Sequence, residues 1–174
     1  NVLRNPDYKQ RIKLIQGSGS DLFKPVFEKY SFLGPENPAA FTMCNPPYYK
    51  SEKEWNLNRQ QAFGGHPVEM VTEGGEASFV RKMVEESVIY KDKVVWFTTL
   101  LGFKHHLKSI KALLESLSHQ HAVTAVKHTT FKQGRTCRWG IAWSFFEGLN
   151  EHEAVEVKFK ISNRANLNGQ AVKD

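Results

Sequence analysis

AAFTMCNPPY, residues 39–48, joins a short apolar run to two consecutive prolines. The apolar run predicts a strand, which must end at the prolines because proline has no N–H for a sheet ladder and restricts the residue before it. Asn45, Pro46, Pro47 and Tyr48 are therefore expected in a loop at the carboxyl end of a strand. Ligands of α/β sheets bind at that end of the strands. The NPPY tetrapeptide is accordingly the first candidate for a functional site.

Strand and helix patterns alternate along the rest of the chain. Strand patterns lie at residues 11–15, 39–44, 93–101, 122–130 and 139–146. Helical spacing of apolar residues indicates helices near residues 79–88 and 107–117. The linker 131–138 is too short for a crossover helix and implies an antiparallel pair. This order predicts an α/β three-layer sheet with a C-terminal antiparallel hairpin.

Other segments have weaker patterns. Asp21 is expected to open a short helical or irregular stretch, and polar residues 50–71 are expected to form a long loop. Residues 155–161 alternate apolar and charged side chains, which makes them a candidate edge strand before an extended tail.

Composition narrows the class of protein. The chain has 174 residues, 40% of them hydrophobic, which is enough for one domain with a core. A net charge of +6 and a pI near 9.3 favour a polyanionic partner. No apolar run approaches the roughly 18 residues of a membrane span, so no membrane association is expected. Cys44 and Cys137 are far apart in sequence, and we expect reduced thiols rather than a disulfide framework or zinc site.

The chemistry that NPPY suits is methyl transfer to a planar exocyclic amine. Such an amine is a poor nucleophile, so acceptors must hold its hydrogens and stabilise the positive charge that develops on nitrogen. The side-chain oxygen of Asn45 and the carbonyl of Pro46 are such acceptors. Tyr48 can stack on a base taken out of its helix or loop. The alternative is that NPPY is a turn with Tyr48 in the core.

The motif and three further segments resemble the methyltransferase-like 16 family and its bacterial relative that methylates an adenine of large-subunit ribosomal RNA. The segments are FGG at 63–65, TEGGE at 72–76 and VWFTTL at 95–100. QGRTCRW at 133–139 with AWSF at 142–145 is similar to the eukaryotic branch in particular. By this resemblance, residues 1–146 are the C-terminal part of a methyltransferase domain, with the catalytic loop and an RNA-facing hairpin, and residues 147–174 are an extension.

The resemblance implies a Rossmann-like class I fold with S-adenosyl-L-methionine as the methyl donor. It implies methylation of the adenine amine in structured RNA, including small nuclear RNA, and a nuclear location, with the cytoplasm as the alternative. Ser20 and Asp21 would lie near the adenine of the cofactor, and Asn45 near both the methyl donor and the target amine. Tyr48 stands where family members often have phenylalanine, and either ring can stack.

Basic residues suggest where RNA would contact the protein. Arg135 and Arg138 flank a turn and carry forked donors suited to phosphates or base edges, although solvated hairpin residues have the same pattern. Lys104 belongs to a basic helix start with His105, His106, Lys108 and Lys111, which could extend that surface or be a solvated face. Lys50 in the long loop could close over the substrate or keep the loop soluble. The segment 73–76, with Glu76, could carry a catalytic carboxylate, but it is expected instead to shape the wall of the site. No spacing of His and Cys indicates a metal site.

Two parts of the family pattern are absent from the sequence. The glycine-rich loop after the family's first strand and the acidic residue that ends its second have no counterpart here. In the family's sheet, two further strands separate residues 11–15 from residues 39–44. We therefore expect a fragment that lacks the N-terminal part of the sheet, is marginally stable alone and binds S-adenosyl-L-methionine poorly until the upstream half is supplied in the same or another chain.

Two rival functions remain open. NPPY also serves methylation of a glutamine amide in proteins, although the linker 133–138 and the basic balance argue against it. The second rival function is that of a non-catalytic RNA-binding module that retains the fold. Cofactor binding separates the enzymes from the module, and the choice of RNA or protein substrate separates the two enzymes.

Overall fold

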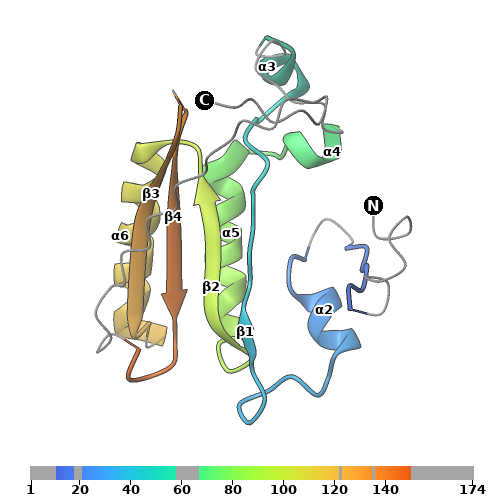
Figure 1. The fold of residues 1–174 in the computed structure, drawn as a ribbon, viewed down its shortest axis with the longest axis vertical. Coiled ribbons are helices and arrows are strands. Elements are labelled where there is room, and N and C mark those ends of the chain that lie inside the picture. The colour runs from blue at the N-terminus through green and yellow to red at the C-terminus, as the bar shows by residue number, and fades with distance from the viewer. Residues whose placement is uncertain (1–10, 18–20, 58–66, 122, 135, 150–174) are drawn as a thin grey trace, which may run out of the picture.

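A computed structural model describes residues 11–17, 21–57, 67–121, 123–134 and 136–149 (Figure 1). Its strands are β1 (Ala39–Phe41), β2 (Val94–Leu101), β3 (Ala125–Gln133) and β4 (Thr136–Ser144). Its helices are α2 (Lys24–Lys29), α3 (Glu52–Leu57), α4 (Pro67–Met70), α5 (Gly75–Ile89) and α6 (Lys104–His121). Within these ranges no helix is both long and apolar enough to cross a membrane.

The strands form one sheet in the order β1-β2-β4-β3. β1 pairs with β2 in parallel, whereas β4 is antiparallel to both β2 and β3. The predicted α/β sheet with a C-terminal antiparallel hairpin is confirmed. The hairpin is tighter than expected, because the ladder continues to the pair Gln133 and Thr136 and Gly134 turns the chain with φ +58°. Most of the expected linker 131–138 is therefore strand.

Two sequence predictions are wrong in whole or in part. Residues 11–17 form no strand, and Ile12 and Leu14 are exposed. A strand needs a neighbour for its backbone groups, and in the described part of the chain neither edge of the sheet pairs with this segment. The long loop expected over residues 50–71 contains α3 and α4, because Ser51 caps α3 by accepting the Glu54 amide at 3.2 Å. The candidate strand 155–161 lies outside the described residues.

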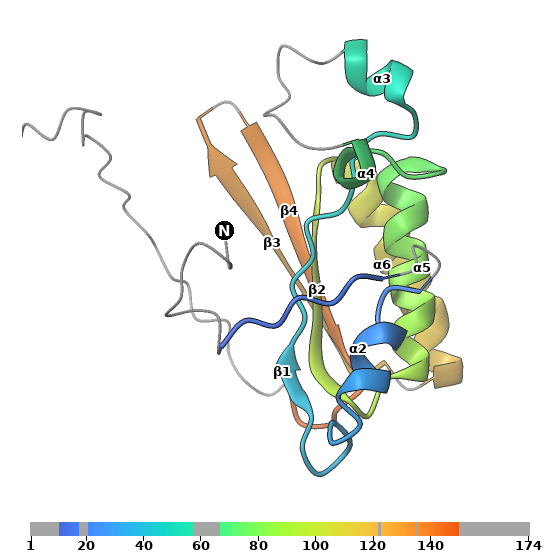
Figure 2. The same ribbon diagram turned by 90° about the vertical axis from the view of Figure 1, so that its right-hand side faces the viewer.

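Helices α5 and α6 pack against one face of the sheet, as the side view shows (Figure 2). Along β2, Phe97, Thr99 and Leu101 are buried under these helices, while Thr98 and Leu100 alternate to the other face and are half-buried. The core residues from the sheet and the two helices include Val80, Met83, Val84, Phe97, Leu101, Ile110, Leu114, Ile141 and Trp143. Their burial holds β2 and β4 at the centre of the fold.

Helix α2 joins this core from the side of α5. Phe27 stacks on Tyr90 with ring centroids 4.7 Å apart. The Glu86 carboxylate on α5 accepts the amides of Leu22 and Phe23, each at 2.8 Å. A carboxylate satisfies the free amides at a helix start, so α5 fixes where α2 begins.

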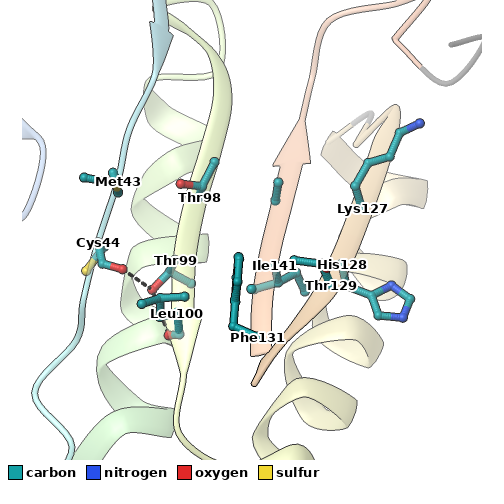
Figure 3. Close-up of a pocket in the computed structure, with 12 residues that line it drawn as sticks. Met43, Cys44, Thr98, Thr99, Leu100, Lys127, His128, Thr129, Phe131 and Ile141 are labelled. Atoms are coloured by element: carbon teal, nitrogen blue, oxygen red, sulfur yellow. Dashed lines mark hydrogen bonds between the residues drawn. The ribbon is translucent and has the colours of Figure 1, made fainter. Parts of the chain in front are cut away.

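The opposite face of the sheet is not covered by the described helices. A cavity of about 500 Å³ lies on it, lined mainly by apolar and threonine residues that include Met43, Thr98, Leu100 and Phe131 (Figure 3). Phe41 and Met43 at the β1 edge are 62% and 85% exposed. This open face is an apolar surface of the kind that another protein segment covers.

Ser87 links α5 to the sheet inside the core. Its hydroxyl accepts a hydrogen bond from Trp143 Nε1 at 2.9 Å and donates one to the Val84 carbonyl at 2.6 Å. Ser87 and Trp143 are fully buried. The indole N–H has its hydrogen bond because a serine stands at this position of the helix.

Ser87→Ala is expected to lower the free energy of unfolding by about 1–3 kcal/mol, because the buried indole N–H loses its acceptor. Urea unfolding measures this. The control is Ser109→Ala, an exposed α6 serine whose hydroxyl bonds to its own helix. Both changes raise helix propensity alike, so equal unfolding midpoints for the two variants would contradict the prediction.

Candidate active site

The pairing of β1 with β2 places the NPPY motif at the carboxyl end of both strands. The parallel alignment continues past β1, since the Cys44 amide donates to the Thr98 carbonyl at 3.2 Å and the Leu100 amide donates to the Cys44 carbonyl at 3.0 Å. Asn45 follows directly. The predicted position of the motif at a strand end is confirmed.

The motif closes on itself. Asn45 is exposed and Pro46 is buried, so the backbone is anchored while the amide side chain faces solvent. The Tyr48 hydroxyl donates a hydrogen bond to Asn45 Oδ1. Asn45 Oδ1 is therefore positioned as an acceptor. Tyr48 lies within reach of any group that replaces its hydroxyl at this oxygen.

Tyr48 is packed between two parts of the chain that are distant in sequence. A Cβ atom at Gly102 would lie 3.1 Å and 3.2 Å from two atoms of its ring. Arg138, from β4, places its guanidinium carbon 5.0 Å from the ring centroid. Burial is the main cause that raises the pKa of the Tyr48 phenol. The ring is half-buried.

Glu76 forms the wall behind Tyr48. This carboxylate is 1% exposed, and it accepts the Gly102 amide at 2.6 Å and pairs with His106 Nδ1 at 2.6 Å. It stands in the first turn of α5, where a negative charge is stabilised by the helix dipole. Glu76 thus lies between the Gly102 turn and α6, behind the Tyr48 ring.

The two glycines before Glu76 explain the TEGGE segment. Gly74 and Gly75 have φ of +75° and +70°, in the left-handed region that side chains disfavour. A Cβ at Gly74 would also lie 2.6 Å from the Cβ of Ser78. Glycine is required here for the chain to turn into α5 with Glu76 pointing inward.

The chain after the motif is tied to the start of α5. The Tyr49 amide donates to the Met70 carbonyl at 3.0 Å, and the Thr72 amide donates to the Tyr49 carbonyl at 2.9 Å. The Lys50 amide donates to Glu54 at 3.0 Å, and the Lys50 side chain is exposed. These bonds fix the exit of the loop.

The structure brings together only some of the site residues predicted from the sequence. Asn45, Pro46, Pro47, Tyr48 and Arg138 form one group, with Lys50 at its edge. Lys104 is exposed at the start of α6, two residues after Gly102. Sequence reasoning missed Gly102 and His106, and the one signal for Gly102 was its place directly after a buried strand. Ser20 and Arg135 lie outside the described residues.

Asp21 is placed beside α5. The amides of the three residues after it donate to Glu86. Burial, together with the charges of Glu86, Glu28 and Asp21, raises the pKa of Tyr90 at the end of that helix. The described surroundings of Asp21 are thus those of α2 and α5.

Cys44 and Cys137 are free thiols, and burial raises the pKa of Cys44. Among the described residues no group of three or more His, Cys, Asp or Glu side chains is arranged to hold a metal ion.

The chain is similar to known RNA methyltransferases. Residues 1–147 match the model of a family described as RNA methyltransferase. The chain belongs to this family. It is 35% identical over 153 residues to the ribosomal RNA large subunit methyltransferase F of Flavobacterium johnsoniae, a match that covers 78% of this chain and 46% of that protein. It is 37% identical over 116 residues to the RNA N(6)-adenosine-methyltransferase mettl16 of Xenopus laevis, covering 62% of this chain and 20% of that protein.

A solved relative has the same fold. The hMettl16 catalytic domain in complex with MAT2A 3'UTR hairpin 1 aligns with a TM-score of 0.54 at 33% identity, covering 64% of this chain and 40% of that one. The predicted RNA methyltransferase family and class I methyltransferase fold are confirmed. The chain spans less than half the length of each of these relatives.

Gly102→Ala is expected to displace Tyr48 and to lower the free energy of unfolding by about 1–3 kcal/mol, because the new methyl group would lie 2.8 Å from Glu76 Oε2 and 3.1 Å from the ring. Urea unfolding measures the loss. The matched control is Gly34→Ala, where a Cβ meets no atom within 4 Å. Its expected effect is neutral or stabilising. Equal stability of the two variants would show that Gly102 is not needed for close packing.

Proposed function

We propose that this chain carries the adenine-binding half of an S-adenosyl-L-methionine-dependent RNA methyltransferase that modifies the exocyclic amine of adenine. The observation that carries the proposal is the joint placement of the Asn45 acceptor and the Tyr48 ring at the carboxyl end of β1 and β2. Family membership supports RNA as the substrate.

In the proposed mechanism, the target amine replaces the Tyr48 hydroxyl at Asn45 Oδ1. One amine hydrogen is held there and the other by the Pro46 carbonyl, which orients the nitrogen lone pair toward the methyl group. Both acceptors stabilise the positive charge that forms on nitrogen as the N–C bond forms and the S–C bond breaks. The extra proton then passes to solvent, because a methylated ammonium of this kind is acidic.

Tyr48 has the second role in this proposal. Once its hydroxyl leaves Asn45, its ring can stack on the adenine that has been taken out of the RNA. Arg138 lies against the same ring, so its proposed role is to position Tyr48 in addition to any contact with RNA. Lys50, Lys104 and Arg135 remain proposed RNA contacts.

S-adenosyl-L-methionine supplies a methyl group on a positively charged sulfur. Asn45 is the polar residue at the strand end that suits it, and Ser20 and Asp21 are the proposed contacts to its adenine. These residues fit only one side of the cofactor. We propose that the glycine-rich and acidic contacts come from the upstream half of the domain, with residues 1–146 as the C-terminal half and 147–174 as an extension.

The names of the relatives support a structured RNA substrate. One is named for ribosomal RNA, one for RNA N(6)-adenosine, and the solved catalytic domain is bound to an RNA hairpin. We propose that the substrate is a hairpin-containing RNA. More specifically, we propose small nuclear RNA and a nuclear location, which the resemblance to the methyltransferase-like 16 family implies.

Asn45→Ala is expected to lower methyl transfer to RNA at least about a hundredfold while the fold survives, because one well-placed polar group is lost from the transition state. The rate is measured with the complete domain, using labelled cofactor and an RNA hairpin, and circular dichroism checks the fold. The control is Asn37→Ala, an exposed loop asparagine. Near-normal turnover would remove Asn45 from the mechanism, and transfer to a glutamine-containing protein instead of RNA would favour the rival enzyme.

The open face of the sheet supports the proposed upstream half. Calorimetry is expected to show weak binding of S-adenosyl-L-methionine to this chain alone and tighter binding when the upstream half of a relative is added, together with a higher Tm. Met43→Glu, on the open face, should reduce this gain. Ile89→Glu makes the same apolar-to-acidic change at a side chain of α5 that is 73% exposed, and it should not reduce the gain. A chain that binds the cofactor and methylates RNA unaided would contradict the proposal.

A further inference from the structure

A groove of about 820 Å³ is lined by residues of α6 and by His128 of the edge strand β3. Basic side chains dominate its lining. Lys104, His105, Lys108, Lys111 and His128 line it together with one carboxylate, Glu115. None of these residues belongs to the NPPY site.

The three lysines form one strip. They are spaced four and three residues apart, which places them on the same side of α6. From Lys104 to Lys111 the helix rises about 10.5 Å. All three are exposed, and in the described part of the chain none of their ammonium groups has a carboxylate within ion-pair distance. Three like charges without partners repel one another, and a polyanion along the groove would relieve that repulsion.

The groove begins next to the NPPY site. Gly102, which contacts Tyr48, is two residues before Lys104. Between them is Phe103, an aromatic side chain that is 50% exposed. An exposed ring followed by a line of cations is the combination that single-stranded nucleic acid binds, with bases on the ring and phosphates along the cations. A strand whose target base reaches Tyr48 is therefore led past Phe103 onto α6.

We propose that the groove between α6 and β3 binds the phosphate backbone of the RNA that flanks the target adenine. Phe103 stacks on a neighbouring base, and Lys104, Lys108 and Lys111 contact consecutive phosphates. The inference rests on the proposed function for its ligand. It adds a binding surface that is separate from the residues of the chemical step.

The test measures the affinity of the complete domain for an RNA hairpin with a single-stranded flank at several salt concentrations. Replacing Lys104, Lys108 and Lys111 together by Gln is expected to weaken binding at least about tenfold. The slope of log affinity against log salt should fall by about two, because binding with three fewer phosphate contacts releases fewer counterions.

The control makes the same change in net charge elsewhere, with Lys29, Arg81 and Lys91 replaced by Gln. These are exposed residues of α2, α5 and the turn after α5. The control should keep the salt slope of the unmodified protein. An equal slope for both triple variants would overturn the proposal, and so would competition by polyglutamate as strong as that by RNA, which would indicate an acidic protein as the partner.

The two proposals fail in different ways. RNA binding and its salt slope do not require turnover, so they can be measured on Asn45→Ala as well. A domain that does not methylate RNA but shows the slope difference would contradict the proposed function and support the groove. A domain that methylates RNA with no slope difference would support the proposed function and contradict the groove.

Discussion

The parallel alignment of Cys44 with β2 is the constraint on which the rest of the site depends. Two backbone hydrogen bonds, to Thr98 and from Leu100, carry the sheet ladder to the last residue before the prolines. Pro46 and Pro47 have no N–H to continue it, so the ladder stops and the chain must leave the sheet there. Because β2 is buried under α5 and α6, this end point is fixed relative to the core. A polar amide then stands at a defined place without being part of any regular element.

The second constraint is the buried Glu76. A carboxylate in the interior is costly unless it is paired and hydrogen-bonded, and Glu76 has both the Gly102 amide and the ring nitrogen of His106. These partners come from the turn after β2 and from α6, so one side chain joins the start of α5 to the start of α6. The turn at Gly102 is thereby held against the Tyr48 ring. The position of the ring thus depends on contacts 26 and 30 residues apart in sequence.

These constraints explain which features were predictable. The strand end at Asn45 follows from proline chemistry, and the helices near α5 and α6 follow from apolar spacing, so both were found. The contacts among Glu76, Gly102 and His106 are long-range, and no local sequence pattern predicts them. The predicted strand at residues 11–15 had a suitable alternation, but alternation does not supply a neighbouring strand. The capped helix α3 was missed because polar residues were read as loop, although Ser51 and Glu54 have the spacing of a helix cap.

Charge is distributed unevenly between the group at the strand end and α6. The group at the strand end is neutral, with the Asn45 amide, two prolines and a tyrosine, and Arg138 is engaged with the Tyr48 ring. The unpaired cations begin beyond Gly102 and continue along α6. Exposed charges act over a Debye length of about 8 Å at physiological salt, whereas the lysine strip extends about 10.5 Å away from its first residue. Lys111, at the far end of the strip, therefore lies more than a Debye length along the helix from Lys104, where the groove meets the turn at Gly102. If RNA binds as proposed, substitutions at the far end of α6 would change its affinity without altering the Asn45 acceptor.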